Sequence, residues 1–111
     1  MANISKPLYA PLNIAQSQTD AVGVAAVTGK RIRVLAVVAQ PGATATDLTF
    51  NTKGSGAGVA ISPLFANLAK TPLVLPHNPK GWFVTNSGEG LSITTSAGST
   101  TGIQLVYETI G

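Results

Sequence analysis

Histidine, cysteine, serine and the carboxylates are the side chains that would carry catalysis. Serine is plentiful in this chain, whereas histidine and the carboxylates are few and cysteine is absent. His77 is the only histidine, so a hydrolytic triad would need it as general base beside one of eight serines and one carboxylate. The carboxylates are Asp20, Asp47, Glu89 and Glu108. His77 stands between Pro76 and the pair Asn78-Pro79, which is typical of a turn. We therefore predict no catalytic residues and no enzymatic activity.

Metal and cofactor chemistry is limited in the same way. The sequence has no cysteine and one histidine, so a zinc or iron site would have to consist almost entirely of carboxylates. Asp47 and Glu108 each fall at the polar position of an alternating strand pattern, which indicates solvated strand faces rather than a pair of catalytic acids. We expect no metal and no cofactor.

Lys30, Arg31 and Arg33 form the only cluster of basic side chains. At most three phosphate contacts would give weak, salt-sensitive binding to nucleic acid, and no aromatic side chain lies among them to stack on bases. The net charge of +3 results from only seven basic and four acidic side chains. We expect no nucleic-acid partner, and we take Arg31 and Arg33 as candidate contacts to an acidic protein surface.

Three glycines, Gly54, Gly56 and Gly58, lie in the stretch KGSGAG. A phosphate-binding loop would need Gly-Lys-Ser/Thr and a following helix, whereas this stretch leads into the β-favouring run VAIS. The glycines therefore predict a mobile hairpin tip. All three are candidate contacts to a partner protein or to another subunit.

The elements that must position these residues are β-strands. From residue 20 onward, short β-favouring runs are separated by Gly, Pro and Asn at the spacing of an all-β sandwich or barrel. The predicted strands are 21–28, 31–40, 46–53, 73–75, 82–85, 91–96 and 103–110. In the third of these runs, alternation places Leu48 and Phe50 inward. The chain has 111 residues, which is the size of one domain.

The run 31–40 is apolar on both predicted faces after Arg33. Leu35 and Val37 share one face of an ideal strand, and Ala36 lies on the other. A strand buried on both faces is either central in a covered sandwich or part of a subunit interface. We favour the interface, because only 10% of the residues are charged, against about 25% in ordinary soluble domains.

Two local structures and an aromatic core are also expected. The runs 21–28 and 31–40 should pair as a hairpin, and Ser62 should cap a single helical turn that reaches Leu68. Large aromatic side chains dominate the interiors of β-sandwiches. The aromatic residues expected in the core are Phe50, Trp82, Phe83 and Tyr107.

The first 19 residues have no sustained periodicity and contain two prolines. They predict an extended N-terminal arm of residues 1–19 ahead of a β-sandwich domain of residues 20–111. The arm lacks the apolar core of a secretory signal peptide, and no run in the chain is long enough to span a membrane as a helix. Its candidate contact residues are Lys6, Tyr9, Leu12 and Ile14.

The middle and C-terminal parts of the chain carry a recognisable succession of motifs. GKRIRVLAVVAQ is followed by TDLTFNT and then by TPLVLPHNPKGWFVTNSGEGLSI. Over roughly residues 29–110, this succession resembles small β-sandwich virion proteins of tailed bacteriophages. The matching motifs are Val74-Leu75-Pro76, Asn78-Pro79, Gly81-Trp82-Phe83 with Thr85, and Gly88-Glu89-Gly90-Leu91.

The resemblance implies a jelly-roll-like antiparallel β-sandwich that acts as a capsid decoration or cement protein. Its partners would be the major capsid protein and other copies of itself, as a trimer rather than a dimer. It would be made in the host bacterial cytoplasm and end on the capsid surface of the virion, with no membrane partner.

Two other functions remain open. One is a tail, collar or fibre-base component of the virion, because the same fold could serve there. The other, from a different class, is a carbohydrate-binding β-sandwich module. That module would need an exposed aromatic platform, for which Trp82, the only tryptophan, is the candidate.

Overall fold

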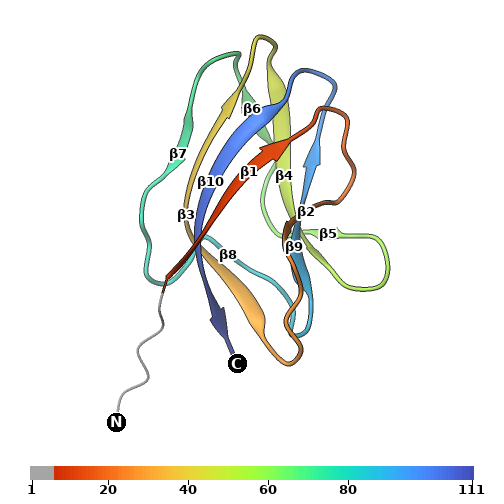
Figure 1. The fold of residues 1–111 in the computed structure, drawn as a ribbon, viewed down its shortest axis with the longest axis vertical. Helices are drawn as coiled ribbons and strands as arrows, with labels where there is room; N and C mark the ends of the chain where they lie inside the picture. The colour runs from red at the N-terminus through yellow and green to blue at the C-terminus, as the bar shows by residue number, and fades with distance from the viewer. Residues whose placement is uncertain (1–6) are drawn as a thin grey trace.

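The computed structural model describes residues 7–111, and every regular element within them is a β-strand. Ten strands form two five-stranded antiparallel sheets, here named sheet I and sheet II (Figure 1). Sheet I consists of β1 (Leu8–Ile14), β3 (Arg31–Pro41), β7 (Leu73–Leu75), β8 (Phe83–Val84) and β10 (Thr101–Ile110). Sheet II consists of β2 (Ala21–Val24), β4 (Thr46–Lys53), β5 (Val59–Ala60), β6 (Phe65–Asn67) and β9 (Gly90–Thr95). The predicted all-β sandwich is confirmed.

The chain passes repeatedly between the two sheets. The strand order is β1-β10-β3-β7 in sheet I, where β8 also pairs with β3, and β2-β9-β4-β5 in sheet II, where β6 also pairs with β4. The predicted hairpin of residues 21–28 with 31–40 is therefore wrong: β2 pairs with β9, and β3 pairs with β10. From opposite sheets, both strands can direct apolar side chains into one core. Residues 7–111 contain no helix that could cross a membrane.

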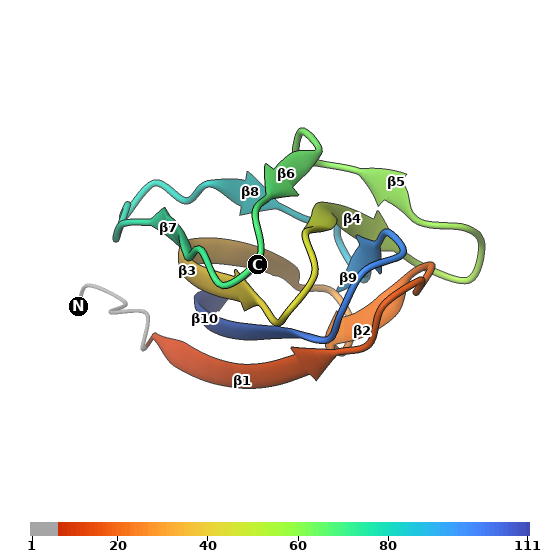
Figure 2. The ribbon, with the colours of Figure 1, turned by 90° about the horizontal axis from the view of Figure 1, so that it is seen from above.

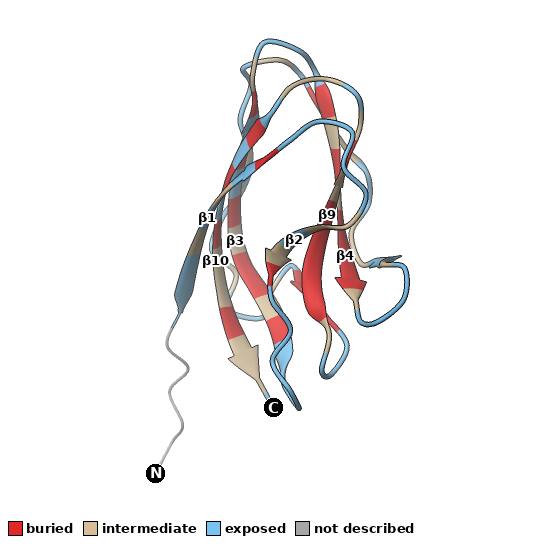
Figure 3. Cartoon of the chain, turned by 45° about the vertical axis from the view of Figure 1, so that its right-hand side comes forward, coloured by how far each residue is buried: buried red, intermediate tan, exposed pale blue. Residues whose placement is uncertain are grey.

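The core lies between the sheets, where the inward positions of their strands meet (Figure 3). Leu48 and Phe50 of β4 are fully buried and point inward, as predicted. The Phe50 ring stacks on Phe83 with 5.1 Å between centroids, and it meets Phe65 nearly edge-on at 6.2 Å. Tyr107 is half-buried and packs against the same cluster. The other fully buried apolar residues include Ile32, Val34, Val37, Ala39, Ile93 and Leu105.

A β-bulge in β3 explains why the run 31–40 is apolar on both faces of an ideal strand. Val34 pairs with Tyr107 of β10 and Ala36 pairs with Val106, so Leu35 has no partner on β10. The extra residue reverses the alternation, so that both halves of β3 direct apolar side chains toward the same core: Ile32 and Val34 before the bulge, and Val37 and Ala39 after it. The two-sided pattern is therefore no sign of a subunit interface. The predicted interface at this strand stays a prediction that needs other support.

The predicted N-terminal arm is largely part of the sandwich. Residues 8–14 form β1, which pairs with β10 over seven residues at the edge of sheet I. The turn that follows is attached to sheet II, because the Thr95 hydroxyl donates to the Ala15 carbonyl oxygen at 2.7 Å and accepts from the Gln18 N–H at 2.9 Å. The proline at position 11 misled the prediction, since an edge strand tolerates proline.

The predicted helical turn from Ser62 to Leu68 is also wrong. Residues 65–67 form β6, which pairs with β4 and brings the Phe65 ring to the core. The Ser62 hydroxyl accepts the Phe50 N–H at 2.9 Å and donates to the Pro63 carbonyl oxygen at 2.8 Å. The hydroxyl therefore forms a hydrogen bond with the backbone of a strand and does not cap the start of a helix.

Candidate contact surfaces

The outer face of sheet I carries exposed apolar side chains. Val38 of β3 lies opposite Val74 of β7, and these side chains are 47% and 56% exposed. Tyr9 of β1 is 69% exposed. It belongs to a row of paired residues that runs from β1 across β10 to β3. The other outward positions nearby are uncharged: Pro11, Asn13, Gln40, Gly102 and Gln104. Because Tyr9, Val38 and Val74, three of the ten exposed large apolar residues among residues 7–111, lie on this face, it has the character of a contact surface.

The residues of the predicted arm fall in three different environments. Tyr9 is exposed and remains a candidate contact, whereas Leu12 is half-buried and packs against the core. Ile14 is 5% exposed and belongs to the core, so it cannot contact a partner directly. Lys6 lies outside the residues that the structure describes.

Arg33 forms an ion pair within the protein, so its charge is already partnered. It sits opposite Glu108 on the neighbouring strand, and its Nη1 lies 2.8 Å from the Glu108 Oε1 atom. Gly81, with a φ of 85°, passes so close that a Cβ there would collide with the Arg33 side chain. Arg33–Glu108 is the only ion pair among residues 7–111. Arg33 is thus a poor candidate for the predicted contact with an acidic surface.

The structure instead groups three other cations at one end of the sandwich, here named the basic end. These are Lys30, Arg31 and Lys53. The Gly88 N–H donates to the Lys30 carbonyl oxygen at 2.8 Å, so the β2–β3 and β8–β9 turns lie side by side (Figure 1). Lys53 pairs with the first residue of β9 and reaches the same end. The carboxylate of Glu89, the one acid nearby, accepts the hydroxyl of its neighbour on β4 at 2.8 Å.

The glycine-rich loop between β4 and β5 projects from sheet II (Figures 1 and 2). Its last glycine is nevertheless held by Asp20, whose Oδ2 atom accepts the Gly58 N–H at 2.9 Å. The Oδ1 atom of Asp20 accepts from Ser92 Oγ at 3.0 Å and from Asn51 Nδ2 at 3.2 Å. Gly54 and Gly56 are exposed and remain candidate contacts, whereas Gly58 serves as an anchor of the loop.

Sequence reasoning missed this role of Asp20, because its partners are 31 to 72 residues away. The only local signal was an aspartate directly before a strand. Asp20 has a φ of 55°, a left-handed conformation that aspartate tolerates better than most residues. Asn51 and Ser92 lie on the outer face of sheet II but are buried, because the Asp20 side chain covers them and accepts their hydrogen bonds.

Gly58→Ala is expected to lower the free energy of unfolding by about 1–3 kcal/mol, because the new Cβ would collide with the Asp20 carboxylate. Gly56→Ala is the matched control, since no atom lies within 4 Å of a Cβ built there. Urea unfolding followed by circular dichroism measures both variants. Equal midpoints for Gly58→Ala and the wild type would contradict the anchoring role of Asp20.

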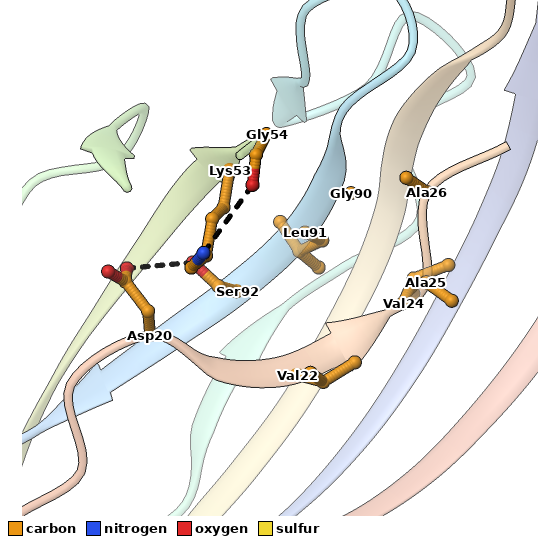
Figure 4. Close-up of a pocket in the computed structure, with 10 residues that line it drawn as sticks. All are labelled: Asp20, Val22, Val24, Ala25, Ala26, Lys53, Gly54, Gly90, Leu91 and Ser92. Carbon is orange, nitrogen blue, oxygen red and sulfur yellow. Dashed lines mark hydrogen bonds between the residues drawn. The ribbon is translucent and has the colours of Figure 1, made fainter. Parts of the chain in front are cut away.

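A trough of about 300 Å³ runs between the end of β2 and the end of β4 (Figure 4). Its floor is low because the outward positions of β9 are the small residues Gly90 and Ser92. It is lined by Asp20, Val22, Val24, Ala25, Ala26, Lys53, Gly54, Gly90, Leu91 and Ser92. Lys53 lies along one wall, with Nζ 3.4 Å from the Gly54 carbonyl oxygen. The trough therefore combines apolar side chains with one cation, Lys53, and one carboxylate, Asp20.

His77 and Trp82 lie in the loop between β7 and β8, which crosses the bulge of β3. The Asn78 N–H donates to the Leu35 carbonyl oxygen at 2.9 Å, and Trp82 Nε1 donates to the Pro76 carbonyl oxygen at 2.7 Å. Trp82 is 40% exposed, so its predicted place in the core is wrong. Within residues 7–111, His, Asp and Glu side chains do not gather in a group of three that could hold a metal ion.

No protein-family model, curated protein or solved structure matches this chain.

Proposed function

We propose that this chain is a non-enzymatic structural protein of a tailed-phage particle that decorates the outer surface of the head. The observation that carries the proposal is the exposed row of Val38 and Val74 on a sheet face with few charges. The chain has only eleven charged side chains for a solvent-accessible surface of 6043 Å². Such a surface suits a protein that is covered by neighbouring subunits in its working state.

The strand order supports a jelly roll as the specific fold. If β5 and β6 count as one interrupted strand, and β7 and β8 as another, eight strands remain. When these eight strands are numbered in chain order, sheet I has the strand order 1-8-3-6 and sheet II has the strand order 2-7-4-5. Jelly rolls have eight strands in two sheets and recur in viral capsid proteins. This agrees with the motifs at residues 74–91, which form β7, the bulge-crossing loop, β8 and the start of β9.

The partners under this proposal are the major capsid protein and other copies of the chain, with a trimer favoured over a dimer. The outer face of sheet I is the surface that a second copy would cover, because it has apolar side chains without like charges to repel a symmetry mate. A tail, collar or fibre-base position would use the same fold and is separated from head decoration by the copy number per particle.

Removal of the chain from purified particles tests the proposed function. Particles stripped of the chain are expected to release their DNA at a lower temperature than intact ones, because a decoration protein bridges neighbouring capsid subunits. Adding the folded chain back should restore the original release temperature, measured with a DNA-binding dye. Identical release temperatures with and without bound chain would contradict a cementing role.

The exposure of Trp82 favours a second candidate, a carbohydrate-binding module. Its indole is fixed by the hydrogen bond to the Pro76 carbonyl oxygen and is partly open to solvent. Tryptophan fluorescence reports directly on this candidate because the chain has one tryptophan. A saturable change on titration with sugars would favour the module over the virion protein, and an unchanged spectrum would remove it.

A further inference from the structure

Sheet I ends on β1 at one edge and on β7 at the other, and neither strand has a partner on its outer side among residues 7–111 (Figure 2). With seven residues, β1 is the longest edge strand in this part of the chain. The unpaired N–H and C=O groups of an exposed edge can pair with the edge of another molecule. The direction in which the backbone groups of β1 and β7 point therefore decides whether copies of the chain can join there.

A hydrogen bond at the end of β3 fixes these directions. The Gly42 N–H donates to the Thr100 carbonyl oxygen at 3.1 Å, one step beyond the pair of Pro41 with Thr101. Bonded and non-bonded pairs alternate along an antiparallel ladder, so Pro41 is in a non-bonded pair, as a residue without an N–H should be. The same alternation places Gln104 of β10, opposite Val38, in a bonded pair. Gln104 therefore turns its backbone groups toward β3 and away from β1.

On its other side, Gln104 lies opposite Pro11 of β1. Because Gln104 bonds to β3, the pair with Pro11 is non-bonded, and Pro11 turns its backbone toward the open edge. The register of β1 with β10 is regular over seven pairs, so Tyr9 and Asn13 face the same way. The outer edge of β1 thus offers the N–H groups of Tyr9 and Asn13, and the N–H between them is missing because proline has none.

The opposite edge of sheet I has the same arrangement. Val38 bonds to β10, so its pair with Val74 of β7 is non-bonded, and Val74 turns its N–H outward. The positions with the same orientation lie two residues before and two residues after Val74, and both are prolines: Pro72 and Pro76. Each edge of sheet I therefore lacks N–H groups at positions that an added strand would use.

The edges of sheet II are protected in a different way. β2 has four residues and a shift of register between Val22 and Val24, and β5 and β6 have two and three residues. Short and irregular edges are poor templates for pairing, as are edges that carry lysine or another charge. β1 and β7 carry no charged side chain, so sheet I lacks that protection.

We propose that Pro11, Pro72 and Pro76 prevent copies of this chain from joining edge to edge through sheet I. Self-association is thereby restricted to the faces of the sandwich. The proposal concerns the free chain and does not rest on the proposed function, so its failure would leave the virion function standing.

Pro11→Thr supplies the missing N–H at the outer edge of β1. In sedimentation experiments this variant should reach about twice the wild-type mass, because one opened edge pairs with the same edge of a second molecule and the contact is then closed. Pro79→Thr is the matched control, since Pro79 is exposed in the loop between β7 and β8. Wild-type mass for Pro11→Thr at every concentration, or an equal increase for Pro79→Thr, would overturn the proposal.

Pro11→Thr also changes a side chain on the outer face of sheet I, so a second measurement must separate backbone from side chain. Hydrogen exchange followed by NMR reports on the amide that Pro11→Thr introduces. This amide should exchange about tenfold more slowly in the doubled species than in dilute protein, because it becomes bonded to the second molecule. Association without any protection of this amide would mean that the molecules join through a face, and the proposal would be wrong.

Opening both edges should change the type of assembly. Pro11→Thr combined with Pro72→Thr and Pro76→Thr gives each molecule two edges that can pair, so light scattering should grow with concentration without reaching the limit of a closed pair. If this combined variant stops at the mass of Pro11→Thr alone, the role assigned to Pro72 and Pro76 is wrong.

The unsubstituted chain supplies a test that stands even if a variant fails to fold. The amide hydrogens of Tyr9 and Asn13 should exchange with solvent about a hundredfold faster than those of Ala10 and Leu12, which bond to β10. Equal protection of all four amides would show that the outer edge of β1 is not open, and would overturn the proposal.

Discussion

Phe50→Ala is expected to lower the free energy of unfolding by about 3–5 kcal/mol. Phe50 is fully buried, and its ring contacts Phe83 and Phe65, which come from separate short strands. The substitution would leave a cavity where sheets I and II are held together. Because small domains have total stabilities of about 5–15 kcal/mol, this loss brings the chain close to unfolding at room temperature. Urea unfolding followed by far-ultraviolet circular dichroism measures the change.

Thr49→Ala is the matched control for Phe50→Ala. Thr49 is the preceding residue of β4, points to the outer face and is half-buried, so its loss should change the stability by less than about 1 kcal/mol. If Phe50→Ala cost no more than Thr49→Ala, the aromatic cluster would not be the centre of the core. The sheets would then have to be held together by the aliphatic residues alone.

Deletion of residues 1–14 is expected to abolish cooperative folding. The deletion removes β1, which pairs with β10 over seven residues, and it uncovers the inward side chains Ile103 and Leu105. It also removes Ile14, which is itself in the core. The expected result is a broad thermal transition, or insoluble protein, in place of the sharp unfolding of the full chain. Differential scanning calorimetry of the purified protein measures it.

A shorter deletion gives the control for this experiment. Removing residues 1–6 leaves all of β1 in place, so the remaining chain should unfold as sharply as the full one. A sharp transition at the wild-type temperature after removal of residues 1–14 would contradict the strand pairing. It would restore the sequence-based prediction of a detachable arm.

Strands with clear alternation and turn residues at both ends could be predicted from the sequence. Residues 46–53 and 73–75 coincide with β4 and β7, and residues 31–40 fall one residue short of β3. The bulge at Leu35 could not be predicted, because it depends on the partner strand and on the loop whose Asn78 N–H bonds to the Leu35 carbonyl oxygen. Periodicity alone could not show which face of the second half of β3 points into the core.

The contact surfaces were less predictable than the strands, because they depend on which distant residues meet. Arg31 and Arg33 are neighbours in sequence, yet only Arg31 remains without an ion pair, because Arg33 lies opposite Glu108. Lys53 joins the basic end from another strand, and no sequence pattern connects it to Lys30. β1 was missed because Pro11 lies within it and its periodicity is weak, as in an arm, while its partner β10 lies at the far end of the chain.

The copy number of this chain relative to the major capsid protein in purified particles tests the central claim most directly. Quantitative mass spectrometry of intact particles, with labelled reference peptides for both proteins, gives this ratio. A head decoration protein should be present at a number of the same order as the major capsid protein. A few copies per particle would place the chain in the tail or collar, and its absence from purified particles would contradict the virion function altogether.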